Sequence, residues 1–413
     1  LDQAGLLTAT TFAGSGASLT ALPAAQLTGT LPAISGANLT GISGSSDYRP
    51  TGKPIIINGD MQVAQRGASF AHPDTNNDAF PVDRFTFQTG AIGVYTSIQE
   101  SLTSGAAFEA GFKKAARIDC TTAQASPASA DYFWFQHIIE AQDCLAFKKG
   151  TSNAETMTVA FWVKSNKTGT SQLTVKDGDN DRICAGTYAI SVANTWEHKV
   201  INIAADTTGA FNNDNGAGYK FEWWLGGGTT YTSGTAPTAW EARTDADRGA
   251  NHLAINDNTA NDWAITGIQV EVGTYTAATL PPFQFESFGD NLARCKRYYE
   301  KTYAYATAVG HSDTSGDAAI GFHVGFMQEN KTTTGMEVSL RPFMVEKRAN
   351  PTVVIYSLDG QSGKWTRWTT GWGVASHTTG LANELAATGF KVTVNSGTTS
   401  NGALGHWTAN SEL

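Results

Sequence analysis

Tryptophan side chains that fall outside the predicted core are the groups best suited to bind a ligand. Trp224 lies on the same side of its predicted strand as Lys220 and Glu222, opposite the apolar side chains, because side chains alternate along a strand. The flat indole face stacks on the C–H faces of sugar rings, and such stacking suits a surface that carries little charge. The candidate sugar-binding tryptophans are Trp224, Trp365, Trp368 and Trp372.

Three of these tryptophans lie close together in a segment rich in Gly and Thr, and polar side chains flank them. Such side chains can hydrogen-bond the hydroxyl groups of a sugar that stacks on an indole. The alternative interpretation of each tryptophan is that it fills the core or a subunit interface. The polar candidates in and near this segment are Asp359, Lys364, Arg367 and His377.

No catalytic signature accompanies these residues. The sequence contains no H-E-x-x-H, G-x-S-x-G or Walker motif, and its eight histidines show no metal-ligand spacing. We therefore expect a protein that is not an enzyme and that has no cofactor and no bound metal. A glycan depolymerase is the alternative, because the carboxylates of glycosidases come from positions that are distant in sequence.

One acidic run resembles the beginning of a calcium-binding loop. The run DGDND at 177–181 lacks the bidentate Glu that an EF-hand has further along, and it lies between two predicted strands. A hairpin turn is the favoured interpretation, and an irregular Ca²⁺ or Mg²⁺ site is the alternative. The four cysteines show no metal spacing either, and we expect free, mostly buried thiols at Cys120, Cys144, Cys184 and Cys295.

The composition argues against two classes of partner. Charged residues make up 16% of the 413 residues, and the net charge is −9 with no cluster of Lys and Arg. Binding to nucleic acid or to anionic lipid needs a basic surface, so we expect neither. No run of 18 apolar residues occurs, so we expect no membrane insertion. The length predicts two or three domains, since single cores rarely grow beyond ~250–300 residues.

Many short segments with alternating apolar and polar residues predict an all-β fold. The clearest are 157–163, 219–225 and 265–272, and clusters of Gly, Asn and Asp separate them. Antiparallel strands joined by such turns predict a jelly-roll β-sandwich over residues 55–286. A second β unit, expected to be another sandwich, covers residues 301–413.

A single clear helix signal connects the two β units. The proline pair at 281–282 keeps the preceding chain extended, and Ser287 then provides an N-cap. Apolar residues follow at helical spacing, which predicts a connecting helix over 287–300 with Asn291 on its exposed side. The expected apolar stripe consists of Phe288, Leu292, Cys295 and Tyr299.

Residues 1–47 are low in charge and repetitive, and the segment 16–22 returns in related form at 36–42. Isolated apolar residues cannot bury themselves within one chain, but they can share a seam with symmetry mates, which predicts a homotrimeric shaft. A disordered linker is the alternative. Residues 48–54 are the expected linker to the sandwich. The chain begins without Met, and we expect the attachment end of the protein to precede Leu1.

Short motifs along the chain agree in order and spacing with one protein family. NGDMQVAQRG at 58–67, DRF at 83–85, LARCKRYY at 292–299 and WTANSEL at 407–413 occur in addition to the L-T-G and L-P-A repeats. This pattern resembles the tail-fibre and receptor-binding proteins of tailed bacteriophages. Asn291 stands where that family often has Glu.

The resemblance implies a virion fibre, most simply a tail fibre, that assembles as a homotrimer in the host cytoplasm. The repeats would form the shaft, a jelly roll similar to those of carbohydrate-binding modules would form the body, and residues 301–413 would form the distal tip. The partners implied are a host surface glycan or outer-membrane protein, and tail or collar proteins that bind the region before Leu1. A capsid or collar fibre with a purely structural role is the alternative.

Overall fold

The computed structural model describes most of the chain beyond the predicted shaft. The expectations for the shaft (1–47) and for most of the linker fall outside the described residues. All described residues belong to one compact unit, Asp47–Leu413. The described ranges are 52–72, 77–312, 324–327, 330–331, 336–368, 377–394 and 402–413.

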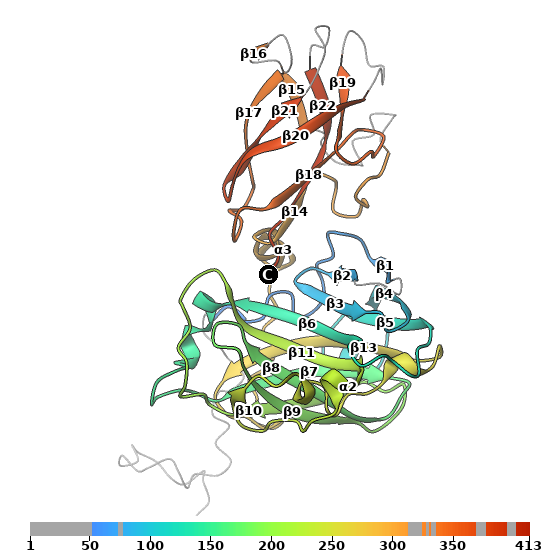
Figure 1. Ribbon diagram of the computed structural model, residues 1–413, viewed down its shortest axis with the longest axis vertical. Helices are drawn as coiled ribbons and strands as arrows, with labels where there is room; N and C mark the ends of the chain where they lie inside the picture. The colour runs from blue at the N-terminus through green and yellow to red at the C-terminus, as the bar shows by residue number, and fades with distance from the viewer. Residues whose placement is uncertain are drawn as a thin grey trace, which may run out of the picture. The chain divides into compact units, whose positions relative to one another are not determined.

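Two antiparallel sheets form a β-sandwich (Figure 1), which confirms the expectation of a mostly β protein. The six-stranded sheet has the order β1 (Ser69–His72), β4 (Val94–Ser101), β5 (Lys114–Thr122), β13 (Asp262–Val272), β7 (Met157–Ser165) and β10 (Glu197–Ile203). The seven-stranded sheet has the order β12 (Glu241–Ala242), β9 (Arg182–Ile190), β8 (Gly169–Asp177), β11 (Ala217–Gly227), β6 (Tyr132–Glu140), β3 (Phe85–Gly90) and β2 (Asn77–Val82).

Aromatic side chains build much of the core between these sheets. The ring of Phe135 on β6 lies 5.3 Å from that of Phe85 and 5.9 Å from that of Trp223, centroid to centroid. Trp263 on β13 meets the Phe135 ring from the other sheet at 5.5 Å. Ring pairs in this range contribute about 0.5–1.5 kcal/mol each beyond the burial of their area. The four cysteines are free and buried, as expected.

The acidic run at 177–181 forms the turn between β8 and β9, in which Asp177 pairs with Arg182 across the hairpin. This confirms the hairpin interpretation. The Asp177 carboxylate accepts hydrogen bonds from the backbone N–H groups of Asp179 and Asn180 at 2.9 and 3.1 Å. The ammonium of Lys149 lies 2.6 Å from the same carboxylate, so a lysine neutralises its charge.

Short helices lie between the strands, and the longest is α3 (Phe288–Lys296). Its N-cap is Ser287, whose hydroxyl accepts the backbone N–H of Asp290 at 3.2 Å, as expected. The others are α1 (Ala106–Glu109), η3 (Ala141–Phe147), α2 (Thr229–Thr232), η4 (Asp245–Asp247) and η5 (Ile255–Asp257). Within the described residues, no helix is long and apolar enough to cross a lipid bilayer.

The connecting helix is shorter than predicted, and its expected apolar stripe is confirmed only in part. Asn291 is buried and donates to Asp60 at 3.2 Å, whereas Phe288 is 48% exposed. Leu292 and Cys295 of the expected stripe pack against the segment that precedes the sandwich, and Asn291 lies on this buried side with them. It ends at Lys296 because the chain enters β14 (Tyr299–Lys301).

The C-terminal strands form a nine-stranded antiparallel sheet around β22 (Gly402–Asn410). Its core includes Trp365, Phe390 and Trp407. The strand order is β14-β22-β19-β20-β21-β17-β16, and β15 and β18 also pair with β22. Their bounds are β15 (Val324–Met327), β16 (Asn330–Lys331), β17 (Met336–Pro342), β18 (Thr352–Tyr356), β19 (Lys364–Trp368), β20 (His377–Ala386) and β21 (Gly389–Val394).

Candidate functional site

Trp224 is fully buried, so the prediction that it offers an exposed face to a sugar is wrong. It lies on the predicted side of β11, but the segment that follows the strand covers it. The Tyr231 ring lies 5.4 Å from the indole, and the guanidinium of Arg248 lies 5.2 Å from it. Gly249 approaches so closely that a Cβ there would lie 2.6 Å from the indole. The chain itself thus occupies the face of Trp224.

Trp365 is also fully buried, which contradicts its predicted role at an exposed surface. Its ring lies against Gly405 of β22, where a Cβ would lie 2.4 Å from the indole. Trp365 therefore belongs to the core of the nine-stranded sheet. Arg367 and Trp368 lie in β19 and His377 begins β20, but the side chains of these three residues fall outside the described structure. Trp372 falls outside it entirely. The sugar-binding roles of these four residues remain predictions.

A hollow of about 190 Å³ on the outer side of the six-stranded sheet combines aromatic and polar side chains. Trp162 on β7 and His198 on β10 are direct partners in the strand register, and their ring centroids lie 5.0 Å apart. Both side chains are half-buried. Trp162 faces outward because its neighbours on β7 face the core. The hollow is completed by Phe112, Gly267, Gln269, Leu280, Pro281 and Phe283.

A bulge in β13 shapes the floor of this hollow. The pairing of β13 with β7 shifts register between Thr266 and Gln269. Gly267 lies inside the shift with a φ of 63°, a conformation that side chains other than glycine rarely adopt. A Cβ at Gly267 would also lie 2.6 Å from Phe112 Cζ. Glycine at this position therefore lets the Phe112 ring line the hollow.

The polar groups of the hollow are neutral. Burial lowers the pKa of His198, and the neighbouring Lys199 lowers it further, so the imidazole has one donor and one acceptor nitrogen at neutral pH. Gln269 Nε2 donates to the carbonyl oxygen of Pro281 at 3.0 Å, which fixes the amide at the floor. An indole beside an imidazole and an amide can bind a sugar ring by stacking and hydrogen bonding.

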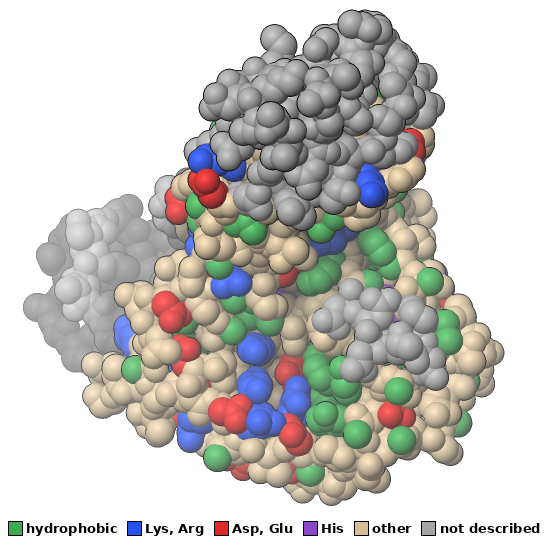
Figure 2. Space-filling view, turned by 45° about the horizontal axis from the view of Figure 1, so that its top comes forward, with side chains coloured by type: hydrophobic (Ala, Val, Ile, Leu, Met, Phe, Trp, Pro, Cys, Tyr) green, Lys and Arg blue, Asp and Glu red, His purple; other side chains and the backbone are tan. Residues whose placement is uncertain are grey.

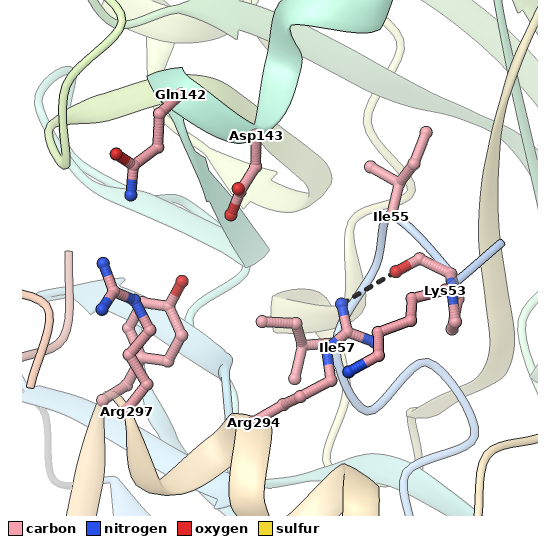
Figure 3. Close-up of a pocket in the computed structure, with 9 residues that line it drawn as sticks. Lys53, Ile55, Ile57, Gln142, Asp143, Arg294 and Arg297 are labelled. Carbon is pink, nitrogen blue, oxygen red and sulfur yellow. Dashed lines mark hydrogen bonds between the residues drawn. The ribbon is translucent and has the colours of Figure 1, made fainter. Parts of the chain in front are cut away.

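A second, larger hollow of about 520 Å³ lies between η3 and α3 (Figure 3). Asp143 points into it from η3, and Arg294 and Arg297 border it from α3. Arg294 is already engaged, because it donates to Glu286 at 2.7 Å and to the carbonyl oxygen of Pro54 at 2.8 Å. Charged and apolar side chains share the lining of this hollow, and no tryptophan is among them.

Asp143, which lines the second hollow, and the buried Glu140 near it have pKa values shifted in opposite directions. Burial raises the pKa of Asp143, and the nearby Glu140 raises it further. Burial alone would raise the pKa of Glu140 too, but hydrogen bonds from Arg297 and Tyr298 lower it. Opposite shifts are typical of acid–base pairs. However, Glu140 accepts two bonds from Arg297 at 2.8 Å and one from Tyr298 at 2.5 Å, so both its oxygens are occupied.

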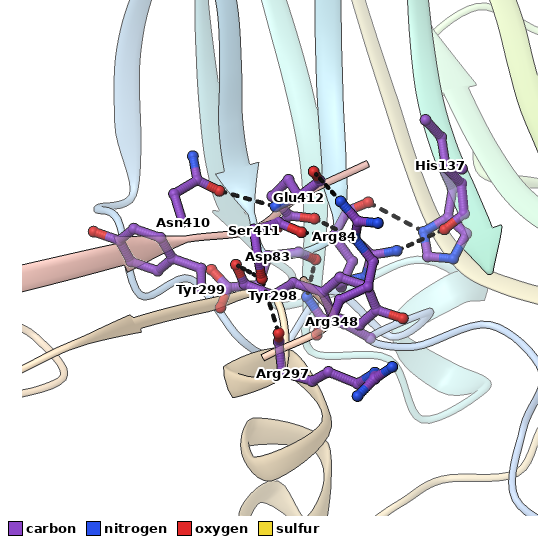
Figure 4. A network of polar contacts seen from close by, with 12 residues as sticks. Asp83, Arg84, His137, Arg297, Tyr298, Tyr299, Arg348, Asn410, Ser411 and Glu412 are labelled. Carbon is purple, nitrogen blue, oxygen red and sulfur yellow. Dashed lines mark hydrogen bonds and ion pairs between the residues drawn. The ribbon is translucent and has the colours of Figure 1, made fainter. Parts of the chain in front are cut away.

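The motifs that resemble phage fibre proteins meet in one buried polar network, which we call the joint (Figure 4). Arg84 forms an ion pair with Glu412, and its guanidinium lies 3.4 Å from the centre of the Tyr298 ring. Gln65 donates to Asp83 at 2.5 Å and to the carbonyl oxygen of Tyr299 at 2.8 Å. The joint thus links the sandwich, the end of α3 and the last residues of the described chain.

Burial and ion pairing act in opposite directions on the charged groups of the joint. Burial alone would lower the pKa of Arg84, but the charge of Glu412 raises it overall. The pKa of Asp83 is raised by burial, although Arg66 and Gln65 act in the other direction. The spacing along the chain gave no sign that positions near 60, 84, 298 and 412 meet.

The sequence contained a partial signal for the hollow on the six-stranded sheet. Alternation along 157–163 placed Trp162 opposite the apolar set of its strand, which is where the structure has it. Its partner His198 could not be inferred, because the register between β7 and β10 joins segments that are separated by two other strands in sequence.

No protein-family model matches the chain, and no curated protein matches it. Three solved structures with distant similarity are the enzymatically active domain of bacteriophage CBA120 tailspike protein 4, TmCBM61 in complex with β-1,4-galactotriose, and discoidin II of Dictyostelium discoideum. The tailspike match has 12% identity and a TM-score of 0.25, and it covers 53% of this chain and 21% of that one.

The TmCBM61 match has 11% identity and a TM-score of 0.25, and it covers 54% of this chain and 99% of that one. The discoidin II match has 10% identity and a TM-score of 0.17, and it covers 76% of this chain and 89% of that one. At these TM-scores the similarities carry no argument about function.

Proposed function

We propose that this protein is a non-catalytic fibre protein of a bacteriophage virion and that it binds a glycan on the host surface. The resemblance of its motifs and repeats to phage tail-fibre proteins supports the placement in a virion fibre. The hollow beside Trp162 supports glycan binding, and it is the single observation that carries this part of the proposal.

The hollow suits one ring of a neutral sugar. Trp162 offers a half-buried indole face, and Leu280 and Pro281 provide apolar contacts at the side. His198 and Gln269 supply hydrogen-bonding groups without charge. A single ring held in this way binds weakly, with a dissociation constant on the order of millimolar.

Weak single sites are useful in a homotrimer. Three copies on one fibre raise the overall avidity by about 10²–10⁴-fold when they reach the same surface together. The proposal therefore retains the homotrimeric shaft at 1–47, a jelly-roll body over 55–286 and a C-terminal tip over 301–413. We propose that the glycan binds to the body and not to the tip, because Trp365 of the tip is part of the core.

The state of the acidic residues supports a non-catalytic role. Glu140 and Asp143 have pKa values shifted in opposite directions, as in an acid–base pair, yet Arg297 and Tyr298 occupy both oxygens of Glu140. Glu140 thus has no oxygen available to a substrate. Release of reducing ends from host polysaccharide would contradict this part and favour a depolymerase.

The test compares glycan binding by the wild type and by Trp162→Ala. The matched control is Tyr132→Ala, which truncates a half-buried aromatic ring on the outer side of the other sheet. We expect Trp162→Ala to weaken binding to neutral oligosaccharides on a glycan array at least ~10-fold, equal to about 1.4 kcal/mol. Tyr132→Ala should bind as the wild type does. Equal binding by Trp162→Ala and the wild type would refute the proposed site.

A further inference from the structure

The outer face of the seven-stranded sheet carries two lysines side by side. Lys220 on β11 and Lys176 on β8 are direct cross-strand partners, so their side chains leave the sheet on the same face. Like charges directly opposite each other destabilise a sheet. Figure 2 shows Lys and Arg side chains gathered with Asp and Glu side chains on the front of the sandwich, beside a hydrophobic area.

The charges around these lysines are paired, with one exception. Lys176 lies 3.1 Å from Asp181, and Arg248 lies 2.8 Å from Glu222. Arg243 joins the same network through Asp181 at 2.8 Å, and it also pairs with Asp245, which lies 3.2 Å from Arg248. Lys220 is half-buried, and no ion pair or hydrogen bond joins its ammonium to any part of the chain that the structure describes. The network therefore has one surplus positive charge, and it lies at Lys220.

The surroundings of Lys220 favour an external anion over solvent. Burial lowers the pKa of Lys220 and the charge of Lys176 lowers it further, although the more distant charges of Glu222 and Asp181 act in the other direction. Its neighbour across the other strand pairing is Ile138, whose side chain is apolar and almost fully buried. Gln136, two residues further along the same face, offers an amide, and its cross-strand partner Glu222 is paired with Arg248. Two cations beside an amide and an apolar floor form a site for a compact anionic group.

We propose that Lys176 and Lys220 bind an acidic group of a polysaccharide, a carboxylate or a sulfate ester, on the outer face of the seven-stranded sheet. This site is separate from the Trp162 hollow, which lies on the other sheet. The proposed ligand is a polysaccharide in which few sugar units carry an acidic group and the others are neutral. A dense polyanion such as nucleic acid needs several phosphate contacts, and a protein with a net charge of −9 and one surplus cation here does not supply them.

The test measures the preference for acidic over neutral oligosaccharides of equal length. The probes are an oligogalacturonide, a sulfated galacto-oligosaccharide and an unsubstituted galacto-oligosaccharide, and the first two distinguish carboxylate from sulfate. We expect the wild type to bind one acidic probe at least ~10-fold more tightly than the neutral one, and Lys220→Gln to lose this preference. Lys220→Arg should retain it, because it keeps the charge.

Two control variants make the result specific. Lys148→Gln removes a positive charge from an exposed lysine that pairs with Glu155 elsewhere on the surface, and it should keep the preference. Trp162→Ala should also keep it, so that failure of the Trp162 site and failure of this site are distinguishable. Thermal melting of Lys220→Gln should be unchanged or higher than in the wild type, since the variant removes a repulsion.

Three results would overturn the proposal. The first is equal affinity of the wild type for acidic and neutral probes. The second is an intact preference in Lys220→Gln. The third is an equal loss of the preference for acidic probes in Lys148→Gln and Lys220→Gln. That result would show that general electrostatic attraction, and not a specific site, causes the preference.

Discussion

Replacing Glu412 by Gln should destabilise the protein strongly, because it removes the anion that neutralises Arg84. The side chain of Arg84 is 2% exposed and that of Glu412 is 8% exposed, so water cannot replace the lost charge. Removing one partner of a buried ion pair costs about 3–5 kcal/mol. The new amide oxygen can still accept a hydrogen bond from Arg84, so we take the lower value of about 3 kcal/mol.

This loss converts to a melting-temperature change that is easy to measure. At about 2–4 °C per kcal/mol for a cooperative unit of ~150–250 residues, Glu412→Gln should melt about 6–12 °C below the wild type. The assay is differential scanning calorimetry at pH 7. The control is Glu384→Gln, which breaks an ion pair with Lys391 between two exposed side chains and should cost about 0–1 kcal/mol.

A double variant separates the unpaired charge from simple loss of packing. Arg84→Met together with Glu412→Leu removes both charges, and replacing a buried ion pair by apolar side chains is often neutral or stabilising. We therefore expect the double variant to melt above Glu412→Gln. A melting temperature of Glu412→Gln within about 1 °C of the wild type would refute the view that Arg84 depends on this partner.

Two further predictions concern stability. Trp365→Ala should lower the free energy of unfolding by about 3–5 kcal/mol, because it empties a fully buried site in the nine-stranded sheet, and urea unfolding followed by circular dichroism would detect it. A loss below about 1 kcal/mol would show that the ring is not part of the core. Glu140 has a pKa below its usual 4.5 in the folded protein. Its ion pair with Arg297 therefore stabilises the fold fully above pH 4.5, and this stabilisation is lost as the pH falls through the lowered pKa. Glu140→Gln should therefore flatten the acid limb of stability against pH, and an unchanged acid limb would contradict the assignment.

The strands could be predicted from the sequence because their signal is local. Alternation along 157–163 and 219–225 gave β7 and β11, and Ser287 gave the start of α3 through its capping pattern. These features depend on neighbours within a few positions, which propensity and pattern describe well.

The exposure of particular side chains could not be predicted, because it depends on distant segments. Alternation placed Trp224 on the outer side of β11, but it gave no sign that Tyr231, Arg248 and Gly249 would cover the indole. Helical periodicity placed Asn291 on the exposed side of α3, but the residue is buried against Asp60, which lies 231 positions away in the sequence. The sequence pattern predicts on which side of a strand or helix a residue lies, and tertiary packing decides whether another segment covers that side.

The joint also has a consequence for the order of folding. Arg84 and Glu412 are 328 positions apart, and contacts between such distant positions form late because loop closure must come first. The strand pairings within the sandwich and within the nine-stranded sheet join closer positions, so both should form before the joint does. Interactions that are absent from the transition state mainly slow unfolding. Glu412 should therefore set how long the assembled protein stays folded far more than how fast it folds.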